Sequence, residues 1–528
     1  MIKGFRTLPE EPTKIEPGPA RLPIVRSEGS TPSERYLAKL ADKSFLNLWS
    51  YPNTYIDKRV RGKGDGKELC DLLVVCGDHI LIFSDKTIEW PDGDEELAWK
   101  RWYKRAIAKS VDQIRGAERW ISKFPERIFI DRECRQPLPI KLPPQERRKI
   151  HGVVVALGAG NACKRFFGEG IGSLFVVPHI KGEDHWKGES VLPFVVGDVD
   201  PTGAFVHVLD EATLDIVLGE FDTIVDLTAY LSKKEKLIRS GILISAAGEE
   251  ELVAYYITHM NSLGEHDFVR PDGSDFIEND GVSFGVGLYG ELLHNQQYQA
   301  KKVADKSSYV WDTLIEQFTT HMLAGTSVLA EGEEFELSEL EQGIHHMALV
   351  PRYKRRLFGE ALLDAFEKAK TTDRFTRAML PGPTEKERHT GFFFMTLAIP
   401  NIQLEGGYEQ YRKARRHMLK TYAYAFLEKY RNLVRIIGIA TEPPHTIGRG
   451  GSSEDLIFIE PKGWPPEFLK ELEEAKKALN IVQQGQFTER EIVENEFPDI
   501  QAPQARLTAS PNRKQRRILA ARSRKKRR

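Results

Sequence analysis

The residues best suited to chemistry are Asp71, Asp85 and Lys86, which lie on two neighbouring predicted strands. The apolar runs Leu69–Val75 and His79–Lys86 are separated by a Gly-Asp pair, which is typical of a two-residue hairpin turn. Such a hairpin places the start of the first strand beside the end of the second. Carboxylates that meet there suit Mg²⁺, which binds a few carboxylates together with waters and a substrate phosphate. We therefore expect a metal site with Asp71 and Asp85 as ligands. Lys86 can stabilise a developing phosphate charge, or position and activate an attacking water.

The surrounding pattern predicts the elements that must position these side chains. A hydroxyl cap, a proline and an early acid open a helix near Ser33, and apolar residues at spacings of three and four continue it to about Leu48. A second predicted helix has apolar residues from Trp99 to Ile121 at the same spacings. With the strands added, the predicted order is helix 33–48, strands 51–60, 69–75 and 79–86, helix 95–123 and strand 151–157.

This segment, 33–157, resembles the core of the PD-(D/E)xK nuclease superfamily, in particular its nuclease-related-domain (NERD-like) branch. The resemblance covers about a quarter of the chain. It implies a restriction-endonuclease-like αβββαβ core, in which Asp71 matches the strand-two aspartate and Lys86 the lysine of E-x-K. Glu34 matches an additional acid on the first helix, and Gln113 a glutamine that some branches carry after the lysine. The resemblance implies hydrolysis of phosphodiester bonds in DNA or RNA with Mg²⁺ or Mn²⁺.

One position departs from the family pattern. Ser84 stands where E-x-K has its glutamate, and Asp85 would face the other side of the strand unless a β-bulge re-aims it. Some restriction enzymes of the superfamily carry serine there and take the acid from the following helix. The second metal ligand is then Asp85 or one of three helix acids: Glu95, Glu96 and Asp112.

Each of these residues also has a purely structural interpretation. Asp71 and Lys86 can form a cross-strand ion pair within an ordinary core. Glu34 can be an acid favoured by the helix dipole, and Gln113 a polar residue on a helix surface.

Two basic segments are candidates for contacts with nucleic acid. Lys100, Arg101, Lys104 and Arg105 interleave with aromatic residues on the second helix, a mixture that can hold phosphates and stack bases, although the tryptophans are expected to pack inward. The segment 513–528 holds ten Lys or Arg and no acid, including Arg513, Lys514, Arg516 and Arg517. A tail of this kind binds phosphates by charge alone, or serves only as a solubilising extension. Arg352–Arg356 and Arg412–Arg416 are further basic clusters.

Composition narrows the class of protein. Of 528 residues, 41% are hydrophobic and 29% are charged, as in soluble globular proteins that build a core. The net charge of −1 conceals an acidic body, because residues 1–512 hold 66 basic and 77 acidic residues, a net −11. No apolar run is long enough for a membrane span, and four cysteines without metal-ligand spacing favour a reducing, cytoplasmic location.

The predicted fold class is α/β, with the αβββαβ core followed by mixed α/β regions and a basic tail. The expected parts are a flexible arm 1–31, a nuclease-like domain 32–215, a mainly helical region 216–345, a C-terminal α/β domain 346–500 and a disordered basic tail 501–528. The preferred function is a metal-dependent nuclease acting in defence or repair. The alternatives are a nucleic-acid-binding protein on a degenerate nuclease fold and a protein-interaction scaffold.

Overall fold

The structure is a computed structural model, and it describes most of the chain. The described residues are 24–57, 66–168, 170–188, 191–277, 280–324, 337–380, 390–398, 407–430, 432–443, 454–481, 492 and 495–498. They form a mixed α/β architecture, as the sequence predicts, and their strands make three sheets. The basic tail, 501–528, and the first 23 residues of the predicted arm lie outside the described residues.

The first sheet, which we call the N-terminal sheet, has the strand order β4-β1-β2-β3-β5-β8. The neighbours β4–β1, β1–β2 and β2–β3 are antiparallel, whereas β3–β5 and β5–β8 are parallel. Its strands are β1 (Ser50–Ile56), β2 (Lys67–Cys76), β3 (His79–Thr87), β4 (Ile128–Phe129), β5 (Lys149–Leu157) and β8 (Val206–Leu209).

The order of elements through β5 follows the sequence prediction, with local differences. Helix α1 (Pro32–Phe45) starts with Thr31 as N-cap and a capping box that Glu34 completes. The predicted helix 95–123 is divided into α2 (Glu95–Tyr103), the π-helical turn η1 (Lys104–Ala108) and α3 (Lys109–Lys123). A π turn widens the helix locally, which hydrophobic periodicity does not reveal.

Helices α1 and α3 cover opposite faces of this sheet. Phe83 of β3 packs on Phe45 of α1, with ring centroids 6.3 Å apart. The next residue, Ser84, donates a hydrogen bond to Gln113 of α3. Successive strand side chains point to opposite faces, so the two helices lie on the two sides. Gly152 of β5 allows α3 to approach closely, since a Cβ there would lie 2.7 Å from Ile114.

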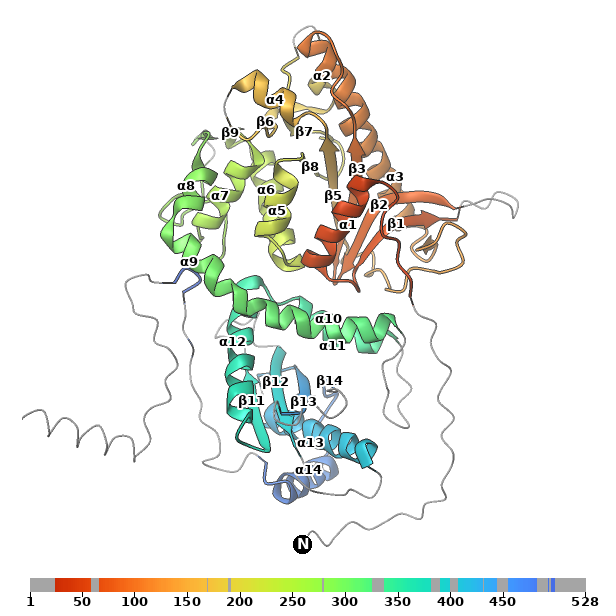
Figure 1. Cartoon of the computed structure of the whole chain (residues 1–528), viewed down its shortest axis with the longest axis vertical. Helices are drawn as coiled ribbons and strands as arrows, with labels where there is room; N and C mark the ends of the chain where they lie inside the picture. The colour runs from red at the N-terminus through yellow and green to blue at the C-terminus, as the bar shows by residue number, and fades with distance from the viewer. Residues whose placement is uncertain are drawn as a thin grey trace, which may run out of the picture.

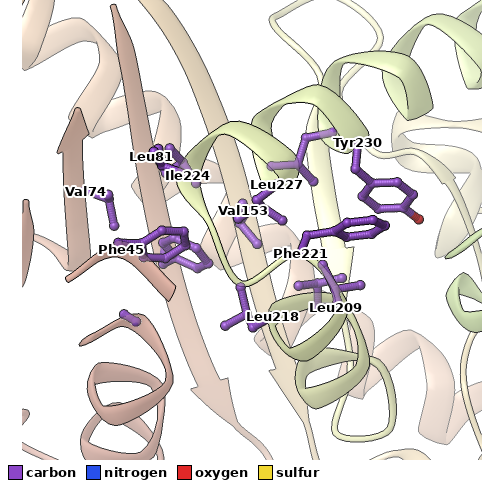
Figure 2. Packing of buried hydrophobic residues seen from close by; sticks show 14 of the residues in the cluster. Phe45, Val74, Leu81, Val153, Leu209, Leu218, Phe221, Ile224, Leu227 and Tyr230 are labelled. Atoms are coloured by element: carbon purple, nitrogen blue, oxygen red, sulfur yellow. The ribbon is translucent and has the colours of Figure 1, made fainter. Parts of the chain in front are cut away.

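One part of the main core lies between the α1 face of the sheet and two further helices, α5 (Thr213–Glu220) and α6 (Ile224–Arg239). Figure 2 shows Phe45 next to Val74 and Leu81, and Phe221 beside Tyr230. The rings of Phe221 and Tyr230 stack with centroids 4.4 Å apart. Helix α1 also meets α5 here, where the Ser44 hydroxyl donates to the Leu218 carbonyl at 3.1 Å, so this core joins segments that are far apart in the sequence.

A middle sheet follows, with the order β10-β9-β6-β7. Its strands are β6 (Phe175–Lys181), β7 (Val195–Asp198), β9 (Leu243–Ala246) and β10 (Val282–Phe284). The predicted boundary at 215/216 runs through this sheet, because β6 pairs with β9 across it. The helical elements of this part of the chain are α4 (Gly160–Phe167), η2 (Gly182–His185), α7 (Glu249–Thr258), α8 (Leu288–His294) and α9 (Gln296–Ala304).

The C-terminal sheet has the order β11-β12-β13-β14, with only β12–β13 parallel. Figure 1 shows it below the other two sheets, with α10 and α11 between them. The elements of this part are η3 (Asp305–Ser308), α10 (Tyr309–Leu323), α11 (Leu337–Ala348), α12 (Arg352–Ala369), β11 (Arg374–Met379), β12 (Thr390–Leu397), α13 (Gly407–Lys429), β13 (Arg435–Thr441), β14 (Asp455–Ile459) and α14 (Pro466–Ala478).

Two further features bear on the predictions. Residues 24–31, expected to belong to a flexible arm, make specific contacts: Arg26 donates to Asp42 at 2.9 Å and to the Ser50 carbonyl at 2.6 Å. Among the described helices, none is both long enough and apolar enough to cross a membrane.

Candidate functional site

The candidate site lies where β2 and β3 separate. Their last registered pair toward this end is Leu72↔Phe83. Beyond it, β2 continues beside β1 as far as Lys67, while β3 continues beside β5 as far as Thr87. Side chains from both faces of the sheet can therefore meet between the two diverging strands.

Asp71 is the central residue of the site. It is 3% exposed, and its Oδ2 accepts the Asp85 backbone N–H at 2.6 Å and contacts Lys86 Nζ at 3.4 Å. Its Oδ1 accepts a longer hydrogen bond, 3.4 Å, from the Gln113 side chain. Burial raises the pKa of Asp71, against the lowering effects of Lys86 and of the Asp85 N–H. The structure therefore brings Asp71, Lys86 and Gln113 together, and the expected cross-strand ion pair is present.

Asp85 is the unsatisfied carboxylate of the site. It is 5% exposed, and neither oxygen has a hydrogen bond of ordinary geometry among the described residues. Burial raises its pKa to about 6; the nearby Ser33 hydroxyl opposes that rise, whereas the charges of Asp71 and Glu34 add to it. As strand alternation predicts, Asp85 lies on the α1 side, whereas Ser84 lies on the α3 side with Gln113. The carboxylate still lies within electrostatic range of Asp71, because the strands separate here.

Glu34 is a helix-capping residue that also lies within electrostatic range of the site. Its Oε2 accepts the Ser30 backbone N–H at 2.8 Å, as a helix-capping acid does, and also the Asn53 side-chain amide at 2.9 Å. Burial raises the pKa of Glu34, but these hydrogen bonds outweigh that effect and the net pKa is lowered. Its charge in turn raises the pKa of both Asp71 and Asp85, so this capping residue also borders the site.

Sequence reasoning missed two residues, Asn53 and Glu68. The Asn53 amide donates to Glu34 and, at 3.0 Å, to Glu68 Oε1, and so bridges α1 and β2. Partial desolvation raises the pKa of Glu68; Asn53 opposes this and the charge of Asp71 adds to it. An asparagine directly after a proline in the middle of a predicted strand was the signal in the sequence that could have marked this bridge.

The three helix acids that were considered in place of the E-x-K glutamate do not contact Asp71. Glu96 pairs with Lys100 at 2.5 Å, and Asp112 is exposed beside Gln113. Glu95 is half-buried, with one carboxylate oxygen unbonded. Among the described residues, none of the three forms a hydrogen bond or ion pair with Asp71.

The predicted basic residues on α2 and η1 differ in their surroundings. Trp99 and Trp102 are fully buried, as expected. Lys100 is engaged by Glu96 and the Gly188 carbonyl, and Lys104 lies 4.9 Å from the centroid of the Trp186 ring. Arg101 and Arg105 are exposed and have no hydrogen bond or ion pair among the described residues, and the same holds for Lys109, one turn before Gln113. The tail residues Arg513, Lys514, Arg516 and Arg517 lie outside the described residues.

The donor set of the site fits a hard divalent cation in part. Asp85 offers two buried oxygens without hydrogen bonds of ordinary geometry among the described residues, and Asp71 adds a second carboxylate, which is the ligand type that Mg²⁺ prefers. Within the described residues, however, no three His, Cys, Asp or Glu side chains stand together at metal-binding spacing. A cation here would therefore take two carboxylates, with water filling its other positions.

Comparisons of the chain with models of known protein families, with curated proteins and with solved structures found no match.

Proposed function

We propose that this protein is a Mg²⁺- or Mn²⁺-dependent nuclease that hydrolyses phosphodiester bonds in DNA or RNA. The observation that carries the proposal is the contact of Asp71 with Lys86 and Gln113 at the point where β2 and β3 separate. It supports the resemblance to PD-(D/E)xK nucleases at three of the positions on which that resemblance was based.

The roles of the residues follow from their chemistry. Asp71 and Asp85 would hold the cation, which supplies Lewis acidity toward the phosphate and lowers the pKa of water. Lys86 keeps a partly exposed ammonium beside Asp71, from which it can donate to a phosphate oxygen or orient a water. Gln113 accepts from Ser84 at 3.0 Å and donates to Asp71, so it holds the orientation of that carboxylate.

The substrate would approach along the consecutive elements α2, η1 and α3, the last of which carries Gln113. Arg101, Arg105 and Lys109 present exposed positive charge on an otherwise acidic body. Phosphate groups are the natural partners of such charges, and their contacts position a nucleic acid without selecting its sequence.

The test is cleavage of plasmid DNA, single-stranded DNA and RNA in the presence of Mg²⁺ or Mn²⁺. Asp71→Asn and Lys86→Met keep the size of each side chain but remove its charge, and we expect both to abolish cutting. Asp112→Asn, which removes an exposed acid on α3, should cut like the wild type. Cutting that survives both site substitutions would overturn the assignment.

A second candidate function is nucleic-acid binding without cleavage. Ser84 favours it, since this residue is fully buried and bonded to Gln113 where the family carries a glutamate. Salt-sensitive binding without any cutting, for the wild type and the Asp71→Asn protein alike, would select this function.

A further inference from the structure

Residues 495–498 follow helix α14 in the chain but pack against much earlier segments. Among residues 482–494 the structure describes only Ile492. The segment 495–498 belongs to no helix or strand, yet Phe497 is half-buried against the main core and the Glu496 side chain is only 17% exposed. Such a segment is held by the surface on which it lies, because it has no helix or strand pairing of its own.

Three basic side chains from three separate parts of the chain hold this segment, and we call them the docking surface: His266, Lys301 and Arg356. His266 follows α7, Lys301 lies on α9 and Arg356 lies on α12. His266 Nε2 is 3.0 Å from Glu496 Oε2, and Lys301 Nζ is 3.3 Å from Glu496 Oε1. Each oxygen of the Glu496 carboxylate therefore has its own basic partner.

The backbone of the segment is recognised as well as its carboxylate. Arg356 is 1% exposed, and it donates to the Asn495 carbonyl at 2.8 Å and to the Glu496 carbonyl at 3.0 Å. The His266 ring meets the Phe497 ring edge to face, with centroids 6.5 Å apart. Backbone hydrogen bonds combined with contacts to particular side chains are the means by which proteins recognise short peptides.

The charge of the docking surface favours an acidic occupant. Burial raises the pKa of Glu496, but His266 and Lys301 outweigh this effect and lower the pKa to about 2. Burial lowers the pKa of His266, yet Glu496 outweighs it and the net pKa is raised. Asp305 also pairs with Lys301, at 2.6 Å, and with Arg356, at 3.3 Å. Without Glu496, His266 would lose this partner and the other two cations would share Asp305, which is costly for buried charges.

We propose that residues 495–498 are an exchangeable peptide ligand of this chain, bound in cis to a surface that recognises an acidic-aromatic sequence of the type Glu-Phe-Pro. The docking surface is then a protein-interaction site that the chain's own segment occupies and blocks. The contacts define the chemistry of the peptide: a carboxylate for His266 and Lys301, backbone carbonyls for Arg356 and an aromatic ring for the core. Exchange breaks no helix or strand, because the four residues belong to neither.

The test is binding of a fluorescein-labelled peptide of residues 492–500 to the full-length protein, followed by fluorescence anisotropy. In the wild type, the tethered segment competes at an effective concentration of about millimolar, so the labelled peptide should bind weakly. Glu496→Gln combined with Phe497→Ala weakens the chain's own segment. We expect this double variant to bind the peptide about tenfold more tightly than the wild type, or better. A peptide with the same two replacements should bind neither protein.

Variants of the docking surface locate the binding. Added to the double variant, Lys301→Met should weaken peptide binding by about tenfold or more, because it removes a cation that contacts the carboxylate. Lys302→Met on the same helix is the matched control and should leave binding unchanged, since Lys302 pairs with Glu220. Equal binding of the peptide to the wild type and the double variant, or binding that survives Lys301→Met, would place the peptide elsewhere and overturn the proposal.

A second measurement keeps the contacts of the segment intact. Phe497 is replaced by para-fluorophenylalanine in the full-length protein, and the fluorine NMR resonance reports whether the ring is packed. Unlabelled peptide at about millimolar concentration should displace the segment and move the resonance toward that of the free peptide. A resonance that does not move would show that residues 495–498 are a fixed part of the fold. Wild-type dimers that the double variant does not form would show that the segment comes from a second copy, contrary to binding in cis.

Discussion

Asp85 is a buried carboxylate without hydrogen bonds of ordinary geometry among the described residues, and such a group lowers the stability of the folded protein. Its raised pKa, about 6, measures the cost of keeping a negative charge among the buried groups around Asp71. Folding alone gains nothing from such a residue. A bound cation would offset the cost of burying this charge. A buried carboxylate with a raised pKa is therefore consistent with a functional site.

Asp85→Asn should therefore stabilise the metal-free protein. The folded-state pKa lies above the ordinary value of 3.8, so the penalty is fully present above pH 6 and disappears as pH falls toward 4. We expect a gain of about 1–3 kcal/mol at pH 7.5 in urea unfolding with chelator present, and a smaller gain at pH 4. Cleavage should be lost in the same variant. A destabilised Asp85→Asn protein would show that the charge is satisfied in solution.

At the scale of elements, the approach of α3 to the sheet sets the position of Gln113. Gly152 permits this approach, because a Cβ would meet the Ile114 side chain at 2.7 Å and Val206 at 3.3 Å. Helix α3 thus packs on β5 at a distance that only glycine tolerates.

Gly152→Ala should displace α3 and cost about 1–3 kcal/mol by overpacking. Because Gln113 moves with the helix, cleavage should fall by more than the loss of folded protein explains. The measurement is specific activity at a temperature where unfolding curves show the variant fully folded. Gly116→Ala on the same helix, where the added Cβ meets nothing within 4 Å, is the control.

His185 links η2 to the middle sheet and predicts a pH effect on stability. It is 1% exposed; its Nδ1 lies 2.7 Å from the Gly182 carbonyl, and its Nε2 accepts the Gly197 N–H at 2.9 Å. The neutral imidazole is therefore required, and burial lowers its pKa to about 4.

The lowered pKa means that only the unfolded state takes up this proton between pH 6.5 and 4. Wild type should lose about 1.4 kcal/mol per pH unit relative to His185→Gln in this window. The gap in unfolding free energy between the two proteins should thus narrow by roughly 2 kcal/mol from pH 7.5 to pH 5. A gap that stays constant would show that His185 does not titrate in this way.

At the scale of the whole molecule, buried ion pairs join the C-terminal half to the rest. Asp312 of α10 accepts from Arg352 at 2.6 Å and from Arg355 at 2.7 Å, and Arg352 also donates to Asp222 at 2.7 Å. Most arginines of the predicted basic cluster Arg352–Arg356 are thus engaged in internal ion pairs. It is a poor candidate for nucleic-acid contacts.

Removing Asp312 should leave two buried guanidinium groups short of a partner. We expect Asp312→Ala to cost about 3–5 kcal/mol in denaturant unfolding, because breaking a buried pair leaves an uncompensated charge. Glu367→Ala, which removes an exposed pair with Lys370, should cost less than about 1 kcal/mol. Similar small losses for both would mean that the network does not join the two halves.

The exposed charges on α2, η1 and α3 should govern binding of the nucleic acid. Replacing Arg101, Arg105 and Lys109 by Gln should weaken binding similarly for different sequences and reduce the salt dependence of the affinity. Fluorescence anisotropy at several salt concentrations measures both effects. The same replacement at Lys39 and Lys236, exposed residues on α1 and α6, should change the salt dependence less. If the dependence of affinity on salt concentration is unchanged in the triple variant, these helical elements are not the contact surface.

The sequence alone determined the α/β class and, apart from the short strand β4, the order of elements as far as β5, because apolar periodicity, caps and the Gly-Asp turn are local signals. It also brought Asp71 and Lys86 together, since a hairpin dictates which residues of its two strands are neighbours. Only the tertiary structure decided which acids surround them. The Asn53–Glu68 bridge lies next to a register shift in β1. The burial of Arg352 and Arg355 depends on helices that are far apart in the sequence and pack together. Such contacts arise from long-range burial and charge pairing, which no local spacing encodes.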